Sequence, residues 1–543
     1  MLKQLTSNPS PGKERDPLAN ITFRPAILAL LAVCAAGWVT YIHFHSPVLP
    51  YDDAFISYRF VDNFVAGKGL IYNAGERAWG YSTITYIFWL SAWRYLLPSV
   101  PLPVIAERAN ALPFAAVCVA VYFLVLRYTH RHAAAVAAAA LIMFNAGLLG
   151  ISTGGMEPFL FLAFALFSFL AADARRPLLA GLLAGLAVLT RIEGLVLVPI
   201  LFVVIGKPRK AAVRMMVATI CPPLAWLAFA HSFYGTYFPH AIIAKARPLY
   251  ILKPLNACSR IVRYLSELFS APGVIGGVSI FVFLILATIA CVVSKRLRAT
   301  AAWQVPMLFW SIFAAYACGN PLLFEWYYPQ LFIPALITAV LGVSITFQHT
   351  SESPEWLRHR VYRAVGVLCS LWIIAATIHG WNALRSPYSP NWSVLSIDSE
   401  PGRLRSKAYK EAALWLNEVR GPHETVMAPE VGALGYYLNG SLIDTCGLVS
   451  PDAIRYLPVP ASERLRGYYG SIPLAFVRDV QPDFIATLPV FGLRNVLEAP
   501  WAMATYHVVQ EFRLPLPTYE SDRVIILKRR DGSLTAGAGE LLH

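Results

Sequence analysis

Long apolar runs separated by short basic clusters are the feature that most constrains the fold of this chain. A helix needs roughly 17 to 25 apolar residues to cross a bilayer, and about eleven segments approach that length. They lie at approximately 25–45, 104–126, 133–150, 158–173, 178–190, 194–206, 212–231, 273–294, 301–318, 330–347 and 364–383. A hydrophobic content of 57% with only 14% charged residues agrees with an integral membrane protein.

The basic clusters between these runs predict the topology. If the eleven spans alternate, the clusters all fall on one side, which the positive-inside rule makes cytoplasmic. They are Lys13/Arg15/Arg24, Arg127/Arg131, Arg175/Arg176, Lys207/Arg209/Lys210/Arg214, Lys295/Arg296/Arg298 and Arg358/Arg360/Arg363. The net charge of +14 is therefore a topology signal, and we expect no nucleic-acid partner. Residues 1–24 are predicted to be cytoplasmic, and everything after about residue 385 extracytoplasmic.

Two segments near the N-terminus decide how the first external loop is drawn. No small-residue cleavage site follows the first span, so we interpret it as a retained helix. The aromatic-rich segment 82–97 is read as an interfacial helix, because counting it as a span would move the later basic clusters outside. Residues 46–103 then form one external loop.

From about residue 385 the composition becomes that of a soluble protein. TVMAPEVG, SLIDTCGL, DFIATLPV, YHVVQEFRL and RVIILKRR predict short strands, and SKAYKEAALWLNEV predicts an amphipathic helix. The fold class is thus an all-α polytopic membrane domain (25–384) with about eleven transmembrane helices, followed by a smaller α/β extracytoplasmic domain (385–543).

The acidic pair Asp52 and Asp53 directly follows the first span. Ionisable groups at or within a membrane are costly, so such an acid is a functional hypothesis by default. A carboxylate here could act as a general base on a hydroxyl, with nearby cations holding a leaving phosphate. The alternative is a structural ion pair between Asp53 and Arg59.

Further polar residues fall at the external ends of the predicted spans. Candidate substrate-binding residues among them are Arg59, Tyr81, Glu157, Arg191, Glu193, His240, Lys245 and Glu325. Glu157 could instead cap a helix N-terminus, and Arg191 and Glu193 could simply brace each other at a turn. The basic group from Lys245 to Arg263 is a candidate surface for a phosphate or for anionic lipid headgroups.

The sequence gives no indication of a metal or cofactor site. The eight cysteines show no CxxC or metal-ligand spacing, and no disulfide framework is indicated. No DxD segment or His/Cys cluster is present. We therefore predict a reaction without a cofactor.

Several of these segments resemble a known enzyme family. YDDAFISYRFVDNFVAGKGLIYNAGERAWGYS is similar to the first external loop of GT-C glycosyltransferases, particularly the AftB-type arabinofuranosyltransferase group. STGGMEPFLF, LTRIEGLVLVP, FYGTYFPHAIIAKA and EVGALGYYLNGSLIDTCGLVSPDA resemble later segments of that group in the same order. The similarity spans about residues 24 to 455.

The resemblance implies an activity and a location. It implies transfer of a monosaccharide, with a pentofuranose among the candidates, from a polyprenyl-phosphate donor with inversion. The acceptor would be a glycan, lipid or protein on the outer side of a bacterial cytoplasmic membrane. The first acid of such a pair is usually assigned as the base, which favours Asp52, whereas the spacing to Arg59 favours Asp53. Glu157 resembles an acid that shapes the substrate pocket.

The chain departs from the family pattern at two positions. Trp79 precedes Gly80-Tyr81-Ser82 where the group often has Glu, and His240 stands where it has Asn. Both positions are candidate sugar or acceptor contacts, so the sugar and the acceptor stay open. Composition alone also fits a transporter or a flippase of a lipid-linked saccharide, and a binding protein for envelope glycans is a third reading.

Overall fold

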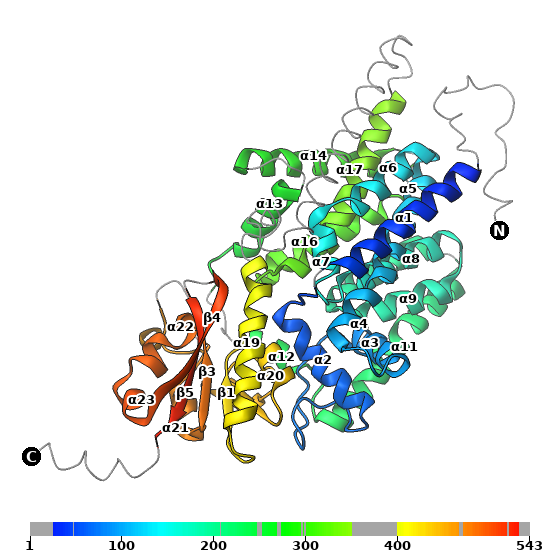
Figure 1. The fold of residues 1–543 in the computed structure, drawn as a ribbon. Coiled ribbons are helices and arrows are strands. Elements are labelled where there is room, and N and C mark those ends of the chain that lie inside the picture. Colours follow the sequence, from blue (N-terminus) through cyan, green and yellow to red (C-terminus); the bar gives the residue numbers. More distant parts are fainter. Residues whose placement is uncertain are drawn as a thin grey trace, which may run out of the picture.

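The computed structural model describes residues 25–530 except 47, 207, 247–251, 269–272, 295–296, 298–299, 350–398, 466–470 and 519–520. Helices dominate residues 25–349, and a small sheet lies within residues 399–530 (Figure 1). This order confirms the predicted sequence of a helical part followed by an α/β part. The predicted boundary at residue 385 lies outside the described residues.

Helices occur at each predicted span that the structure describes. They are α1 (Pro25–His45), α4 (Leu102–Ala109) with α5 (Ala111–Thr129), α6 (His132–Met143) with α7 (Ala146–Ser152), α8 (Pro158–Asp173), α9 (Pro177–Thr190), η2 (Ile192–Val196) with α10 (Leu197–Ile205), α11 (Arg209–Tyr234), α14 (Gly273–Val293), α16 (Gln304–Gly319) and α17 (Pro329–His349). The predicted span 364–383 lies outside the described residues.

Two helical segments of the described chain are long and apolar enough to cross a membrane by themselves. They are Leu102–Thr129, which combines α4 and α5, and Arg209–Tyr234, which is α11. Most of the other apolar helices are shorter, at 10–17 residues. The count of eleven spans therefore stays a prediction.

Shorter helices fill the connections between these segments. The predicted external loop contains α2 (Asp52–Val65) and α3 (Ile84–Leu96), of which α3 coincides with the segment predicted to be interfacial. Three further elements follow at α12 (His240–Ala246), α13 (Asn256–Leu268) and η3 (Glu325–Tyr327). Close packing between α9 and α11 depends on small residues, since a Cβ on Gly185 would meet the Thr219 carbonyl oxygen at 2.7 Å.

The C-terminal part contains a mixed five-stranded sheet of order β2-β1-β3-β5-β4. Its strands are β1 (Val426–Ala428), β2 (Leu442–Asp444), β3 (Phe484–Thr487), β4 (Tyr506–Thr518) and β5 (Ser521–Arg529). β1 pairs in parallel with β2 and β3, whereas β5 is antiparallel to β3 and β4. All five strands occur at the segments predicted to be short strands bounded by Pro, Gly and Asp.

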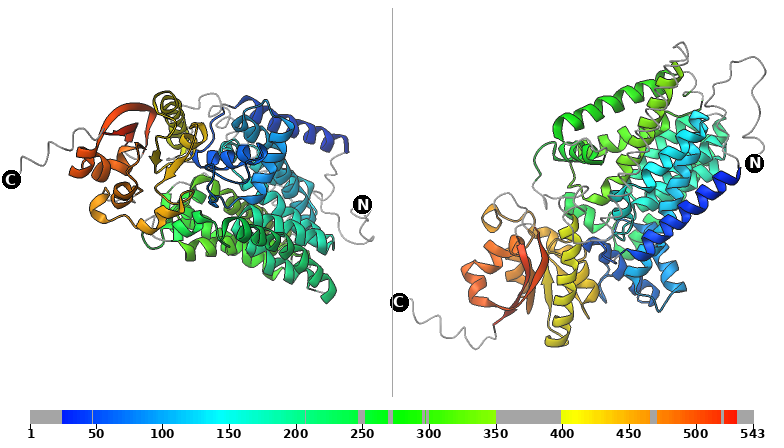
Figure 2. Two further views of the ribbon diagram at one scale, coloured as in Figure 1. Left: turned by 90° about the horizontal axis from the view of Figure 1, so that it is seen from below. Right: turned by 45° about the horizontal axis from the view of Figure 1, so that its top comes forward.

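Helix α19 (Ser399–Val419) lies between the sheet and the helical part of the molecule (Figures 1 and 2). It occurs where the amphipathic pattern predicts a helix. The remaining short helices are α20 (Ala433–Tyr437), η6 (Pro451–Tyr456), η7 (Ala461–Glu463), α21 (Leu474–Val480), α22 (Pro489–Gly492), η8 (Leu493–Leu497) and α23 (Pro500–Thr505). The junction between the two parts is therefore formed by α19 and α20 on one side and α2 on the other.

Candidate active site

The acidic pair forms the first turn of α2. The N–H of Tyr51, which precedes the pair, donates to the carbonyl of Gly154 at 3.0 Å. Gly154 cannot carry a side chain here, because a Cβ would overlap the Tyr51 ring. Acidic residues in a first turn are favoured by the helix dipole. Asp52 and Asp53 are thus fixed against the loop that precedes α8.

Asp52 is bound by the C-terminal part of the chain. Its carboxylate is buried and accepts hydrogen bonds from the N–H of Ala433 at 2.9 Å and from the N–H of Gly432 at 3.2 Å. Burial, followed by the negative charge of Glu430, raises the pKa of Asp52 to about 7. Asp53 is half-buried, and among the described residues no hydrogen bond reaches its carboxylate. The two adjacent acids therefore have different environments.

Glu430 adds a third carboxylate to this junction. It lies two residues beyond β1, the strand that β2 and β3 flank on opposite sides, and the carboxyl end at such a switch point commonly binds ligands in open sheets. Arg405 Nη2 lies 2.9 Å from one oxygen of Glu430, and the Tyr409 hydroxyl donates to the other at 2.6 Å. Burial raises the pKa of Glu430, although Arg405 opposes this.

Arg403 of α19 fixes the same junction from a second direction. Its buried guanidinium donates to the carbonyls of Leu49 at 2.5 Å, Gly150 at 3.2 Å and Thr153 at 3.4 Å, and it lies 5.3 Å from the centre of the Tyr51 ring. Leu49 lies three residues before the acidic pair, whereas Gly150 lies on α7 (Ala146–Ser152) and Thr153 directly follows it. Helix α19 is therefore fastened directly to the loop that carries Asp52.

Sequence reasoning gave no role to Glu430, Arg403, Arg405 or Tyr409. One signal was available for Glu430, because the segment EVGALGYY directly follows a predicted strand and was used only for the resemblance. The residues of α19 carried no such signal, since charged residues on an amphipathic helix usually mark a solvated face.

Glu157, Arg191 and Glu193 form a buried ionic triad. Arg191 donates to Glu157 at 2.5 Å and to Glu193 at 2.9 Å, and the Tyr316 hydroxyl donates to Glu193 at 2.6 Å. Glu157 precedes α8 at the N-cap position, yet its side chain makes no capping hydrogen bond. Two carboxylates thus neutralise Arg191, which leaves no unshared positive charge for a donor phosphate.

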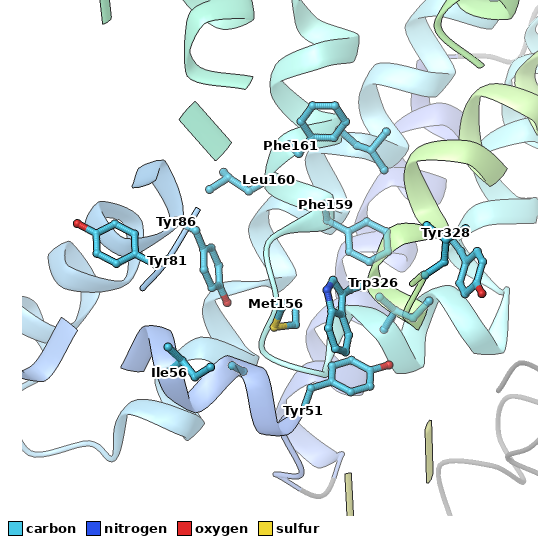
Figure 3. Close-up of a cluster of buried hydrophobic side chains, with 14 of the residues drawn as sticks. Tyr51, Ile56, Tyr81, Tyr86, Met156, Phe159, Leu160, Phe161, Trp326 and Tyr328 are labelled. Carbon is cyan, nitrogen blue, oxygen red and sulfur yellow. The ribbon is translucent and has the colours of Figure 1, made fainter. Parts of the chain in front are cut away.

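Glu325 lies close to the acidic pair. Its charge raises the pKa of Tyr51, although burial is the larger cause. The neighbouring Trp326 packs on Tyr51 with ring centroids 5.0 Å apart, and Figure 3 shows both rings beside Met156, the residue before Glu157. Tyr327 lies 4.5 Å beneath the Arg191 guanidinium. η3 therefore connects the acidic pair with the triad.

Arg59 has a different environment from the one expected of a substrate ligand. Its guanidinium donates to the Tyr72 carbonyl at 2.8 Å, to Asn73 Oδ1 at 3.2 Å and to the carbonyls of Gly435 and Gly440. In the described part of the chain no ion pair joins Arg59 to Asp53. Its position is that of a residue fastening α2 to the C-terminal part.

The loop after α2 adds two further fastenings. The side-chain Nδ2 of Asn73 donates to the Leu442 carbonyl at 3.0 Å, and its Oδ1 accepts from the Leu442 N–H at 3.1 Å. The side chain thus makes the two hydrogen bonds to β2 that a neighbouring strand would make. The Tyr72 hydroxyl donates to the Val431 carbonyl. The external loop and the C-terminal part are thus joined by side-chain to backbone hydrogen bonds.

Tyr81 and His240 make contacts with Tyr234 and Trp79, and Lys245 lies on α12. The Tyr81 hydroxyl is 3.0 Å from that of Tyr234 on α11, within an aromatic cluster. The Trp79 N–H donates to His240 Nδ1 at 3.0 Å, and the His240 N–H donates to the Trp79 carbonyl at 2.8 Å. Lys245 is half-buried on α12. The two departures from the family pattern, Trp79 and His240, are therefore in direct contact.

The structure thus separates the predicted site residues into two groups. Glu157, Arg191 and Glu193 form the triad, which Tyr51 and η3 connect to Asp52, Asp53 and Glu325. Arg59, Tyr81 and His240 bind other residues, and Lys245 lies on α12. Among the described residues, no group of three or more His, Cys, Asp or Glu side chains has an arrangement that could hold a metal ion.

Three solved structures resemble this chain. The oligosaccharyltransferase of Archaeoglobus fulgidus is similar over 86% of this chain and 70% of its own length, with 15% identity and a TM-score of 0.53. ArnT from Cupriavidus metallidurans, bound to undecaprenyl phosphate, is similar over 94% and 99%, with 14% identity and a TM-score of 0.52. The mycobacterial arabinofuranosyltransferase AftD is similar over 93% and 40%, with 14% identity and a TM-score of 0.51.

The chain has the GT-C fold. This agrees with the type of fold that the sequence motifs imply, at identities that establish the fold alone. A family model described as a domain of unknown function, DUF8728, matches residues 399–530, which is the α/β part with α19. No curated protein matches the chain.

Proposed function

We propose that this chain is an inverting membrane glycosyltransferase that uses a polyprenyl-phosphate-linked monosaccharide as donor. The acceptor is a hydroxyl of an envelope glycan, lipid or protein on the outer side of a bacterial cytoplasmic membrane. The observation that carries the proposal is the acidic pair at the start of α2, held between the two parts of a GT-C fold. The similarity of the motif series to the AftB-type group supports a pentofuranose as the first sugar to test.

The proposed reaction is a single displacement. The acceptor oxygen forms a bond to the anomeric carbon of the donor sugar while the bond from that carbon to the phosphate oxygen breaks. The acceptor proton passes to a carboxylate of the pair, and the bonding electrons leave with polyprenyl phosphate. One base is sufficient for this inversion, so we expect activity to persist after EDTA treatment.

We assign the general base to Asp52. A base works best when its pKa lies near the operating pH, and burial with a neighbouring Glu430 raises the pKa of Asp52 to about 7. The more exposed Asp53 is placed to orient the acceptor hydroxyl. An acid limb of kcat/KM near pH 7 would support this assignment, whereas a limb well below pH 6 would contradict it.

The basic residues near α12 and α13 are candidates to bind the departing phosphate. Lys245 lies on α12, and Arg260 of α13 donates to the Leu323 carbonyl at 3.1 Å, two residues before Glu325. Arg247 lies outside the described residues. We propose Lys245 as the phosphate ligand, because the two carboxylates beside Arg191 neutralise its charge.

The test supplies polyprenyl-phosphate sugars and envelope acceptors to membranes containing the full chain, with mass spectrometry of the product. Asp52→Asn and Asp53→Asn are compared with Glu511→Gln, which removes a carboxylate from an exposed ion pair on β4. We expect the transfer activity of at least one aspartate variant to fall 100-fold or more, which is about the contribution of general base catalysis. Full activity in both variants would refute the mechanism. Movement of the lipid-linked sugar across the membrane without transfer would instead indicate a flippase.

A further inference from the structure

We propose that the C-terminal domain (399–530) is part of the catalytic centre, with Glu430 as a positioning residue that tunes Asp52 electrostatically. This inference rests on the proposed function and assigns a role to the part of the chain that matches a domain of unknown function. It concerns residues on α19 and beyond β1, about 380 positions along the sequence from the acidic pair.

The first step is geometric. The segment that begins with Glu430 also supplies both N–H groups that bind Asp52, from Gly432 and Ala433. Gly432 lies so close to α2 that a Cβ there would overlap the Asp52 backbone oxygen and carboxylate. Since Glu430 is two residues from Gly432, any shift of this segment moves Glu430 and the Asp52 donors together.

The second step concerns how Glu430 itself is held. Arg405 and Tyr409 both lie on α19 and bind opposite oxygens of Glu430, at 2.9 and 2.6 Å. The side chains of Arg405 and Glu430 are only 12% and 13% exposed. A buried carboxylate with fixed partners at a domain junction provides an oriented negative charge whose effect on a neighbour is weakly screened.

The third step is the balance of charge around Asp52. Asp53 lies beside it on α2, Tyr72 on the following loop, and Glu430, Arg405 and Tyr409 on the C-terminal domain. Glu430 and Asp53 disfavour ionisation of Asp52, and Arg405 favours it. The charges of Glu430 and Arg405 nearly cancel. Removal of either side chain gives the pair a net charge at Asp52, and the sign of that charge depends on which side chain is removed.

A purely structural ion pair would predict a different outcome. Breaking a buried pair destabilises the fold, but it need not change the pH at which the enzyme becomes active. The proposal instead requires the acid limb of activity to follow the net charge of the pair. That difference separates the two roles.

The experiment uses the full chain and measures kcat/KM against pH. Glu430→Gln removes a negative charge near Asp52 and keeps the positive charge of Arg405, so the acid limb should move down by about one pH unit. The double variant Glu430→Gln/Arg405→Gln restores a neutral pair and should bring the limb back towards that of the wild type. Glu511→Gln is the control and should leave the limb unchanged, because its ion pair is exposed on β4.

An acid limb that is unchanged in Glu430→Gln would overturn the proposal. If Glu430→Gln does not fold, Tyr409→Phe removes one hydrogen bond to Glu430 at nearly constant shape and should lower kcat about threefold to tenfold with the donor KM unchanged. An unchanged kcat in Tyr409→Phe would also contradict the proposed role of Glu430.

A second readout keeps this test independent of the proposed function. Infrared titration of carboxyl-labelled aspartate reports ionisation without any substrate, and the high-pH carboxyl band should titrate lower in Glu430→Gln. Wild-type protein that transfers no sugar would refute the proposed function, and the titration would still decide whether Glu430 acts on Asp52.

Discussion

Substitution of Gly432 by alanine should weaken both catalysis and the docking of the two parts of the chain. A Cβ at this position would overlap the backbone oxygen and carboxylate of Asp52, and backbone atoms of a helix cannot move aside cheaply. The N–H donors of Gly432 and Ala433 would therefore be displaced from the carboxylate. Hydrogen bonds to a charged group contribute about 1.5–3 kcal/mol each, so docking of the two parts should weaken by about 3–6 kcal/mol.

The expected catalytic effect follows from displacement of the base. A misplacement of about 1 Å commonly costs about 100-fold in rate, so kcat of Gly432→Ala should fall by about that factor. Sugar transfer measures kcat, and hydrogen exchange of the Gly432–Ala433 amides measures docking. Both amides should exchange faster in the variant, since they lose their acceptor.

Gly421→Ala is a matched control in the same domain. A Cβ on Gly421 would meet Glu424 at 3.6 Å or more, which is an ordinary contact. This variant should keep wild-type kcat and wild-type exchange at residues 432 and 433. If Gly432→Ala showed wild-type activity together with wild-type amide protection, the inferred contact with Asp52 would be wrong.

Three further predictions follow from the same contacts. Folding raises the pKa of Asp52 to about 7, so protonated Asp52 stabilises the folded state. This contribution is complete below about pH 4 and is lost as the pH rises through about 7. The Tm of the wild type should therefore fall relative to that of Asp52→Asn between about pH 4 and pH 7. Arg191→Met leaves two buried carboxylates unpaired and should lower the free energy of unfolding by about 3–5 kcal/mol, whereas Arg191→Lys should lower it less, as chemical denaturation can measure. His240→Ala removes the acceptor of the Trp79 N–H and should lower the free energy of unfolding by about 1 kcal/mol. His240→Asn should lower it much less, because Oδ1 of asparagine can replace Nδ1; thermal unfolding compares the two variants.

Local patterns predicted most of the elements of this fold. Apolar runs indicated the helices of the first part, and short segments bounded by Pro, Gly and Asp indicated all five strands. These signals depend on neighbours within a few residues, so they survive without knowledge of the tertiary structure. The number of membrane crossings did not follow, because most of the apolar helices are too short to decide it individually.

The site was predictable in part, and the limit is sequence separation. The pairing of Arg191 with Glu193 is nearly local and was one of the readings that the sequence suggested. The contact between Asp52 and Ala433 joins residues 381 positions apart, and no periodicity or spacing reports such docking. Arg59 shows the same limit, since its charge suggested a substrate ligand while two of its carbonyl partners, Gly435 and Gly440, lie on the C-terminal domain.

The burial of Asp52 explains why the two parts of the chain must act together. A buried carboxylate without partners is strongly disfavoured, and α2 alone supplies only the dipole of its first turn. The N–H groups of Gly432 and Ala433 supply the missing donors, and burial together with the charge of Glu430 raises the pKa of Asp52. The bonds that hold the C-terminal domain in place are therefore the bonds that position the proposed base. It follows that variants which weaken docking, such as Asn73→Ala at β2, should lower kcat as well as stability, whereas a recognition module appended to a complete enzyme would change only the choice of acceptor.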